Sequence, residues 1–143
     1  MKIILFLTLS LLVVFSINVQ AQTEATIWDF FWLETLAGTA GAAVGFYGSF
    51  GLEQIGVCGD GLMCAMTLNA VTATVGVAVV GGLNDVEGNL WLAPIGGLLG
   101  SFIGGLADLI IASSTKQDAY LVIHPMTGLL AALGYNLGAK MKP

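Results

Sequence analysis

The chain has 143 residues, of which 57% are hydrophobic and 9% are charged, whereas about a quarter of the residues in a soluble domain carry a charge. A surface of this composition is poorly soluble in water, so the sequence predicts a membrane protein whose main partner is the lipid bilayer. The formal net charge is −5 with only 4 Lys and Arg residues together, which excludes the basic surface that nucleic acid binding requires.

The N-terminal residues 1–21 have the three parts of a secretory signal peptide. Lys2 gives a positive start, residues 3–14 form an apolar core, and residues 19–21 make a small-residue cleavage site that ends in Ala21. We therefore expect delivery through the secretory pathway to a cell membrane or envelope, with cleavage of the signal. An uncleaved N-terminal anchor helix is the alternative.

Four apolar segments follow, and the links between them are polar. The segments span residues 32–50, 62–80, 90–112 and 119–137. A helix over the third segment reaches about 35 Å, which is enough to cross a hydrocarbon core of about 30 Å. The prediction is an all-α membrane fold in which residues 22–143 form a single helical domain, a bundle of four helices.

Small residues recur at every fourth position in the first and third segments. These rows are Ala37, Gly41 and Gly45 in one segment and Gly96, Gly100 and Gly104 in the other. Such a row follows one face of a helix and lets another backbone approach closely. The rows resemble the glycine-zipper membrane segments of a group of small bacterial surface antigens. That resemblance implies helix packing in a membrane and self-association, and it implies no activity.

The two halves of the mature chain also resemble each other. Trp32-Leu33 aligns with Trp91-Leu92, and Gly38, Gly41 and Gly45 align with Gly97, Gly100 and Gly104. We interpret this match as an internal repeat of two tandem helical hairpins, residues 32–82 and 90–138. Two helices per unit give both copies the same orientation in the membrane. We expect the first helices of the two hairpins to meet through their glycine faces.

The link between the first two segments contains Cys58 and Cys64, which flank two glycines. The pair either closes a disulfide in an oxidising compartment or stays as two free thiols. The sequence does not decide between these two states. A cleaved signal followed by four spans puts this link in the cytoplasm, where disulfides are disfavoured. Two Cys with no further Cys or His nearby do not complete a metal site.

Three ionisable residues near the segment ends are candidates for a proton- or cation-responsive site: Asp108, His124 and Glu53. An ionisable side chain inside a span is costly and turns toward protein or water. Asp108 and His124 lie at similar depths on antiparallel neighbours, and the repeat puts Glu53 on the same side. A carboxylate there stabilises a protonated imidazole. The interpretation that we favour instead places Asp108 and His124 among headgroups, with His124 capping a helix that restarts at Pro125.

No catalytic or cofactor-binding motif is found. The chain has a single His and lacks both the Gly-x-Ser-x-Gly and the phosphate-loop patterns. We therefore expect no enzyme, no cofactor and no metal. The main hypothesis is a small multi-pass membrane protein with a structural or scaffolding role that forms a homo-oligomer, with other protein partners unknown. The alternative is an oligomeric pore or membrane-permeabilising protein, with Asp108 and Glu53 along a cation-favouring path. A proton-coupled transporter is the third hypothesis.

Overall fold

The computed structural model describes residues 26–58, 61–115 and 120–142. It contains the helices α2 (Ile27–Gln54), α3 (Gly61–Leu83), α4 (Leu92–Thr115) and α5 (Ile123–Asn136), and the short strands β1 (Val86–Glu87) and β2 (Lys140–Met141). The predicted all-α fold of four helices is confirmed, and each helix lies on one of the four apolar segments. The predicted signal peptide lies outside the described residues.

The first turns of α2 and α4 are capped by short polar side chains. Asp29 Oδ2 accepts a hydrogen bond of 2.6 Å from the backbone N–H of Thr26, and Asn89 Oδ1 accepts bonds of 3.1 Å from the N–H groups of Trp91 and Leu92. These oxygens satisfy N–H groups that have no partner inside the helix. The capping box of Thr26 and Asp29 starts α2 several residues before the predicted segment, so the aromatic residues Trp28, Phe30, Phe31 and Trp32 are helical.

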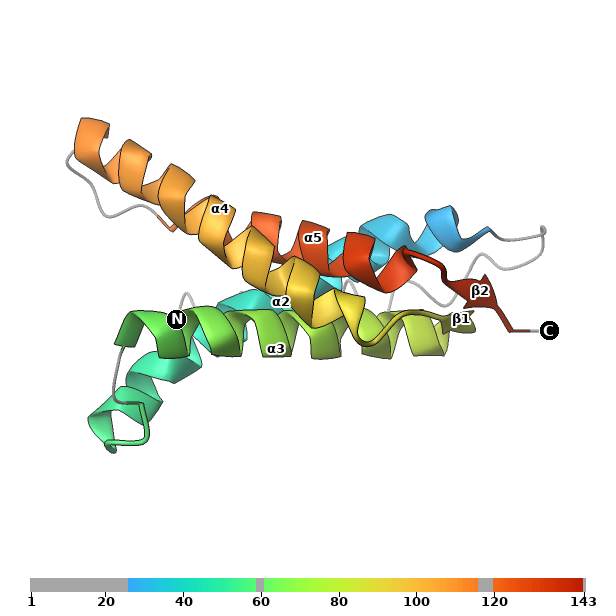
Figure 1. Ribbon diagram of the computed structural model, residues 1–143, viewed down its shortest axis with the longest axis horizontal. Coiled ribbons are helices and arrows are strands. Elements are labelled where there is room, and N and C mark those ends of the chain that lie inside the picture. Colours follow the sequence, from blue (N-terminus) through green and yellow to red (C-terminus); the bar gives the residue numbers. More distant parts are fainter. Residues whose placement is uncertain (1–25, 59–60, 116–119, 143) are drawn as a thin grey trace, which may run out of the picture.

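The helices pack as two hairpins, α2 with α3 and α4 with α5 (Figure 1). The shortest helix, α5, also contacts α2 and α3, and α3 contacts α4. In contrast, α2 and α4 make few contacts with each other. The expectation that the first helices of the hairpins meet through their glycine faces is therefore wrong. Each of them packs on the second helices instead.

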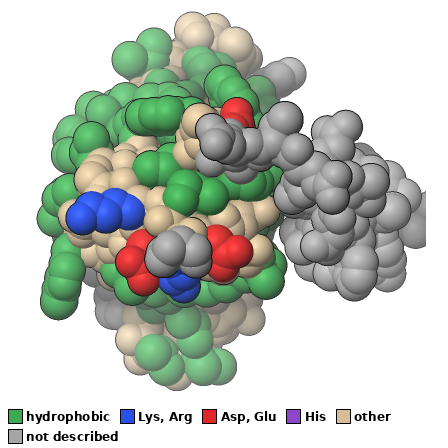
Figure 2. Space-filling view, turned by 90° about the vertical axis from the view of Figure 1, so that its right-hand side faces the viewer, with side chains coloured by type: hydrophobic (Ala, Val, Ile, Leu, Met, Phe, Trp, Pro, Cys, Tyr) green, Lys and Arg blue, Asp and Glu red, His purple; other side chains and the backbone are tan. Residues whose placement is uncertain are grey.

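A small antiparallel sheet closes one end of the bundle. Val86 pairs with Met141 and Glu87 with Lys140, and the N–H of Lys142 donates to the carbonyl of Asp85 at 2.7 Å. The sheet ties the chain that follows α5 to the link between α3 and α4. Figure 2 looks onto this end and shows Lys and acidic side chains close together, surrounded by hydrophobic ones.

The distribution of side chains is the reverse of that in a soluble helical protein, where large apolar residues fill the core. Much of the interior consists of glycine, alanine and polar side chains. Large apolar side chains are exposed along α3 and α4: Val71, Val75, Val79, Leu98, Leu99, Phe102, Ile103, Leu106, Leu109 and Ile110. By length and composition, both helices are able to cross a membrane.

Candidate functional site: glycine contacts and buried polar groups

Glycines bring the backbones of α2 and α3 into direct contact. A Cβ atom at Gly41 would overlap the carbonyl oxygen of Thr72, and one at Gly45 would overlap that of Leu68. In the reverse direction, a Cβ atom at Gly76 would overlap the carbonyl of Ala37. All three members of the row Ala37, Gly41 and Gly45 therefore lie at the contact between α2 and α3.

The same kind of contact joins α4 to α5. Cβ atoms at Gly96 and Gly100 would overlap the carbonyl oxygens of Leu130 and Met126, and one at Gly104 would overlap the backbone of Ile123. All three glycines of the predicted row therefore face the second helix of their own hairpin. Whether such rows also join separate copies of the chain stays a prediction.

Gly38 and Gly97, each one residue after the first member of its row, also lie against the other hairpin. A Cβ atom at Gly38 would meet the backbone of Gly128 in α5 at 3.0 Å, and one at Gly97 would meet the Cα atom of Ala70 in α3 at 3.1 Å. Residues that align in the proposed repeat thus take corresponding places in the bundle. This correspondence supports the repeat, which stays a prediction because duplication itself is not observed.

Asp108 is buried, with 4% of its surface exposed, and its carboxylate caps α5. Oδ1 accepts hydrogen bonds of 3.0 and 2.9 Å from the N–H groups of Leu121 and Val122, and Oδ2 accepts one of 2.9 Å from Ile123. The positive end of the α5 dipole adds to this stabilisation. The expectation that His124 caps this helix is wrong, because Asp108 reaches across from α4 to do so.

His124 lies in an aromatic cluster beside this cap. Its ring centroid is 5.1 Å from that of Phe46 and 6.0 Å from that of Tyr47, and Phe46 also packs against Tyr120 at 5.0 Å. Only 9% of His124 is exposed, and neither ring nitrogen has a hydrogen-bond partner. Within the described residues, therefore, the predicted pair of Asp108 and His124 is adjacent but not joined by a hydrogen bond.

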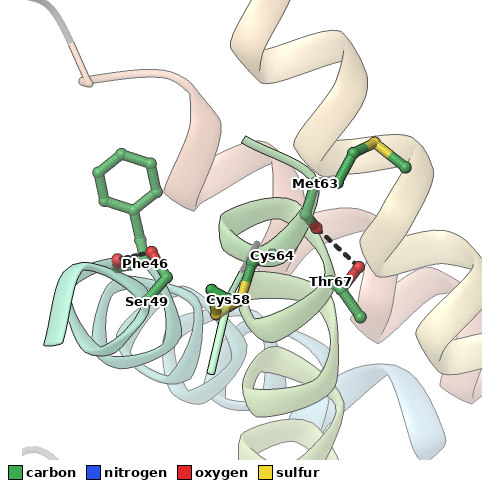
Figure 3. Close-up of a disulfide and its surroundings, with 6 residues drawn as sticks. All are labelled: Phe46, Ser49, Cys58, Met63, Cys64 and Thr67. Carbon is green, nitrogen blue, oxygen red and sulfur yellow. Dashed lines mark hydrogen bonds between the residues drawn. A yellow bond between two sulfur atoms is a disulfide. The ribbon is translucent and has the colours of Figure 1, made fainter. Parts of the chain in front are cut away.

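Glu53 and the two cysteines lie at the turn between α2 and α3. Glu53 is exposed, and its carboxylate lies beside Gly61 at the start of α3, 3.1 Å from a Cβ atom built there. Cys58 and Cys64 are bonded to each other, with their Cα atoms 5.8 Å apart (Figure 3). Of the two alternatives for the cysteines, the structure contains the disulfide.

A cluster of hydroxyl and amide groups connects three helices in the middle of the bundle. The Ser101 and Thr127 hydroxyls are hydrogen-bonded at 2.9 Å, and the Asn69 amide donates to Thr127 Oγ1 at 3.4 Å. Thr127 in turn donates to the carbonyl of Ile123 at 2.6 Å. These bonds fix α3, α4 and α5 relative to one another.

A second buried carboxylate, Glu34, was not among the predicted site residues; it is fully buried on α2. Its Oε2 atom accepts a hydrogen bond from the Nδ2 atom of Asn136, which also donates to the carbonyl of Ala132 at 2.9 Å. Among the residues that the structure describes, Glu34 Oε1 and Asn136 Oδ1 have no hydrogen-bond partner. One sequence signal could have indicated its burial: Glu34 lies four residues before Gly38, on the packed face of the helix.

Neither a search for metal ligands nor a comparison with known proteins assigns a function to these groups. In the part of the chain that the structure describes, no group of three or more His, Cys, Asp and Glu side chains is placed to hold a metal ion. Comparison of the chain with family models, curated proteins and solved structures gave no match. The contacts described above are therefore the basis for the proposed function.

Proposed function

We propose that this protein is a small multi-pass membrane protein with a structural role, a compact helical scaffold that associates with copies of itself. The observation that carries the proposal is the reversed arrangement of its side chains. Small and polar residues are buried between the helices, while large aliphatic residues cover α3 and α4. Lipid tails solvate such an exterior, and close backbone packing holds such an interior together.

The dimensions of α3 and α4 agree with this proposal. They have 23 and 24 residues, and helices of that length extend about 35 Å, slightly more than the hydrocarbon core of a bilayer. Neither helix carries an Asp, Glu, Lys or Arg residue except Asp108, whose carboxylate is turned into the protein. An outward charge in the hydrocarbon region is thereby avoided.

Aromatic and charged residues at the sheet end fit a membrane–water interface. Trp28, Trp32 and Trp91 are all exposed, Trp91 by 85%, and they lie near the starts of α2 and α4. Indole rings favour the headgroup level of a bilayer. The charged groups near β1 and β2 face outward at this same end (Figure 2). We therefore place this end of the bundle at one membrane surface.

The packing contacts favour a scaffold over the pore that is the alternative hypothesis. A cation path needs carboxylates directed toward water, whereas both oxygens of Asp108 accept backbone hydrogen bonds. The glycine rows are occupied by neighbouring helices of the same chain. In the proposed homo-oligomer, copies therefore meet through the apolar outer faces of the helices.

The proposal is tested by reconstituting the purified mature chain in liposomes. We expect the protein to resist extraction by alkaline carbonate, to form crosslinked oligomers, and to carry no cation flux. Release by carbonate would rule out a membrane-spanning bundle. A cation flux that disappears in Asp108→Asn, a variant that keeps one oxygen for the cap, would support the pore instead.

A further inference from the structure

Glu34 is a carboxylate buried in the helix core without a compensating charge. It is fully buried, and the one group in the described part of the chain that donates to it is the neutral amide of Asn136. Moving an ionised carboxylate out of water is strongly unfavourable even after relaxation, unless a counter-charge or several donors replace the water. One amide donor replaces only a small part of the hydrogen bonds that water makes to a carboxylate.

Within residues 26–58, 61–115 and 120–142, the charged and titratable groups around Glu34 include no positive partner. On α2, the nearest such residue along the chain is Asp29, which is acidic and exposed. The facing helix α3 has no Asp, Glu, Lys, Arg, His or Tyr. On α5, the hydroxyl of Tyr135 donates to the carbonyl of Val86. Glu87 of β1 and Lys140 of β2 are exposed.

Two buried oxygen atoms at this position receive no hydrogen bond from any described residue. They are Glu34 Oε1 and Asn136 Oδ1, and both are hydrogen-bond acceptors in the charged state of the carboxylate. Binding one proton removes the charge of Glu34 and turns one of these acceptors into a donor. No covalent bond breaks, and the proton comes from water.

We propose that Glu34 is a proton-binding site in the helix core, with the proton on Oε1 and the Asn136 amide on Oε2, and that the docking of α5 on α2 depends on this proton. Asn136 is the last residue of α5, directly before the segment that leads to β2. Loss of the proton places a charge between α2 and this end of α5. The inference rests on the burial of Glu34 between helices and does not depend on the proposed scaffold role.

Infrared spectroscopy of the purified full-length chain in mild detergent tests the proposal. The C=O stretch of a protonated carboxylic acid should be present at neutral pH, where exposed carboxylates are ionised, and should disappear at higher pH. It should be absent in Glu34→Gln and unchanged in Glu53→Gln, a matched control at an exposed acid. No such band in the wild-type protein, or a band that persists in Glu34→Gln, would overturn the proposal.

The dependence of stability on pH gives a second, independent readout. A group that binds its proton more tightly in the folded state stabilises the fold at low pH and loses that contribution as pH rises. The ratio of folded to unfolded protein should fall by up to about tenfold per pH unit in the wild type, but not in Glu34→Gln. The same slope in both proteins would contradict a role for Glu34.

A third variant keeps the test usable if Glu34→Gln does not fold. Asn136→Leu removes the donor that stabilises the charged carboxylate, so the infrared band should persist to higher pH than in the wild type. An unchanged titration would contradict the assigned geometry.

Repeating the experiments with Na⁺ varied at fixed pH distinguishes a bound proton from a bound sodium ion. Stability that follows Na⁺ without an infrared band would replace the proton by a sodium ion and overturn the proposal as stated.

Discussion

The two buried carboxylates of this protein are held in opposite ways. Asp108 accepts three backbone N–H groups at the start of α5, whereas Glu34 accepts a single side-chain amide of Asn136. A helix N-terminus supplies several donors and a favourable dipole, so it stabilises a full negative charge away from water. One neutral amide does not. Burial alone therefore says little about whether an acid is ionised, and the donors around it decide.

The different lengths of the helices explain why Asp108 has this partner. α4 has 24 residues and α5 has 14, so α5 begins alongside the interior of α4 rather than at its end. Its first N–H groups then lie beside the surface of α4. The carboxylate of Asp108 is on that surface and accepts hydrogen bonds from them.

The largest effect is expected when the close contact between α4 and α5, the helix that both buried carboxylates contact, is removed. Gly100→Ile places a branched side chain against the backbone of Met126 and Thr127. Because a backbone atom cannot move aside cheaply, we expect a loss of at least about 3 kcal/mol in the free energy of unfolding. Titration with SDS, followed by circular dichroism in mild detergent, measures this loss.

Gly48→Ile is the matched control for this substitution. It makes the same change in a helix at a glycine whose Cβ position has no atom within 4 Å. We expect its free energy of unfolding to change by less than about 0.5 kcal/mol. Equal effects of Gly48→Ile and Gly100→Ile would show that helix propensity, and not close packing, determines the result.

Removing the cap of α5 is expected to have the next largest effect. Asp108→Ala leaves three N–H groups without their acceptor, and hydrogen bonds to a charged group are worth about 1.5–3 kcal/mol each before water replaces part of them. We expect a net loss of about 2–3 kcal/mol. Hydrogen exchange at residues 121–123 should increase more than in α3. Exchange that is equally slow in both proteins would contradict the cap.

A smaller effect is expected in the polar cluster that lies between the two acids along α5. Thr127→Val keeps the side-chain shape but removes the hydroxyl that bonds Ser101 and Asn69. Hydrogen bonds between helices in a membrane contribute about 0.6 kcal/mol on average, so we expect a loss of about 1 kcal/mol in the same SDS titration. A loss as large as that of Asp108→Ala would mean that this cluster holds the bundle together.

The smallest effect at neutral pH is expected for Glu34→Gln. Glutamine has nearly the shape of a protonated Glu34, so the free energy of unfolding should change by less than about 1 kcal/mol. The variant should become the more stable protein as pH rises, because it has no proton to lose. If the wild type remains the more stable protein at high pH, Glu34 is ionised in the folded state and the contrast with Asp108 is lost.

The sequence predicts the four helices because their positions depend on local patterns. Apolar length locates each helix, and the four-residue spacing of Gly41, Gly45, Gly100 and Gly104 identifies the faces that touch other backbones. The choice of neighbour is not local. Equivalent glycines lie on both α2 and α4, and the sequence cannot tell whether they meet each other or the second helices.

The polar site was predicted only in part for the same reason. Asp108 and His124 were identified because each is ionisable within an apolar segment. Their partners depend on where α5 begins, and the capping N–H groups belong to the backbone, which no residue pattern marks. Glu34 was missed because it lies near the polar start of the first segment, where an acid is usually solvated, whereas Asn136 and the end of α5 cover it.

The central claim is that the small and polar faces of the helices meet each other while the apolar faces of α3 and α4 meet lipid. Nitroxide labels at single added cysteines, with the native disulfide intact, test it directly in liposomes. Labels at Val75 and Val79 of α3, and at Leu99 and Ile103 of α4, should be relaxed by dissolved oxygen but not by a polar nickel chelate. A label at Val77, which is buried, should respond weakly to both. Strong relaxation by the nickel chelate at the four outer positions would contradict the account.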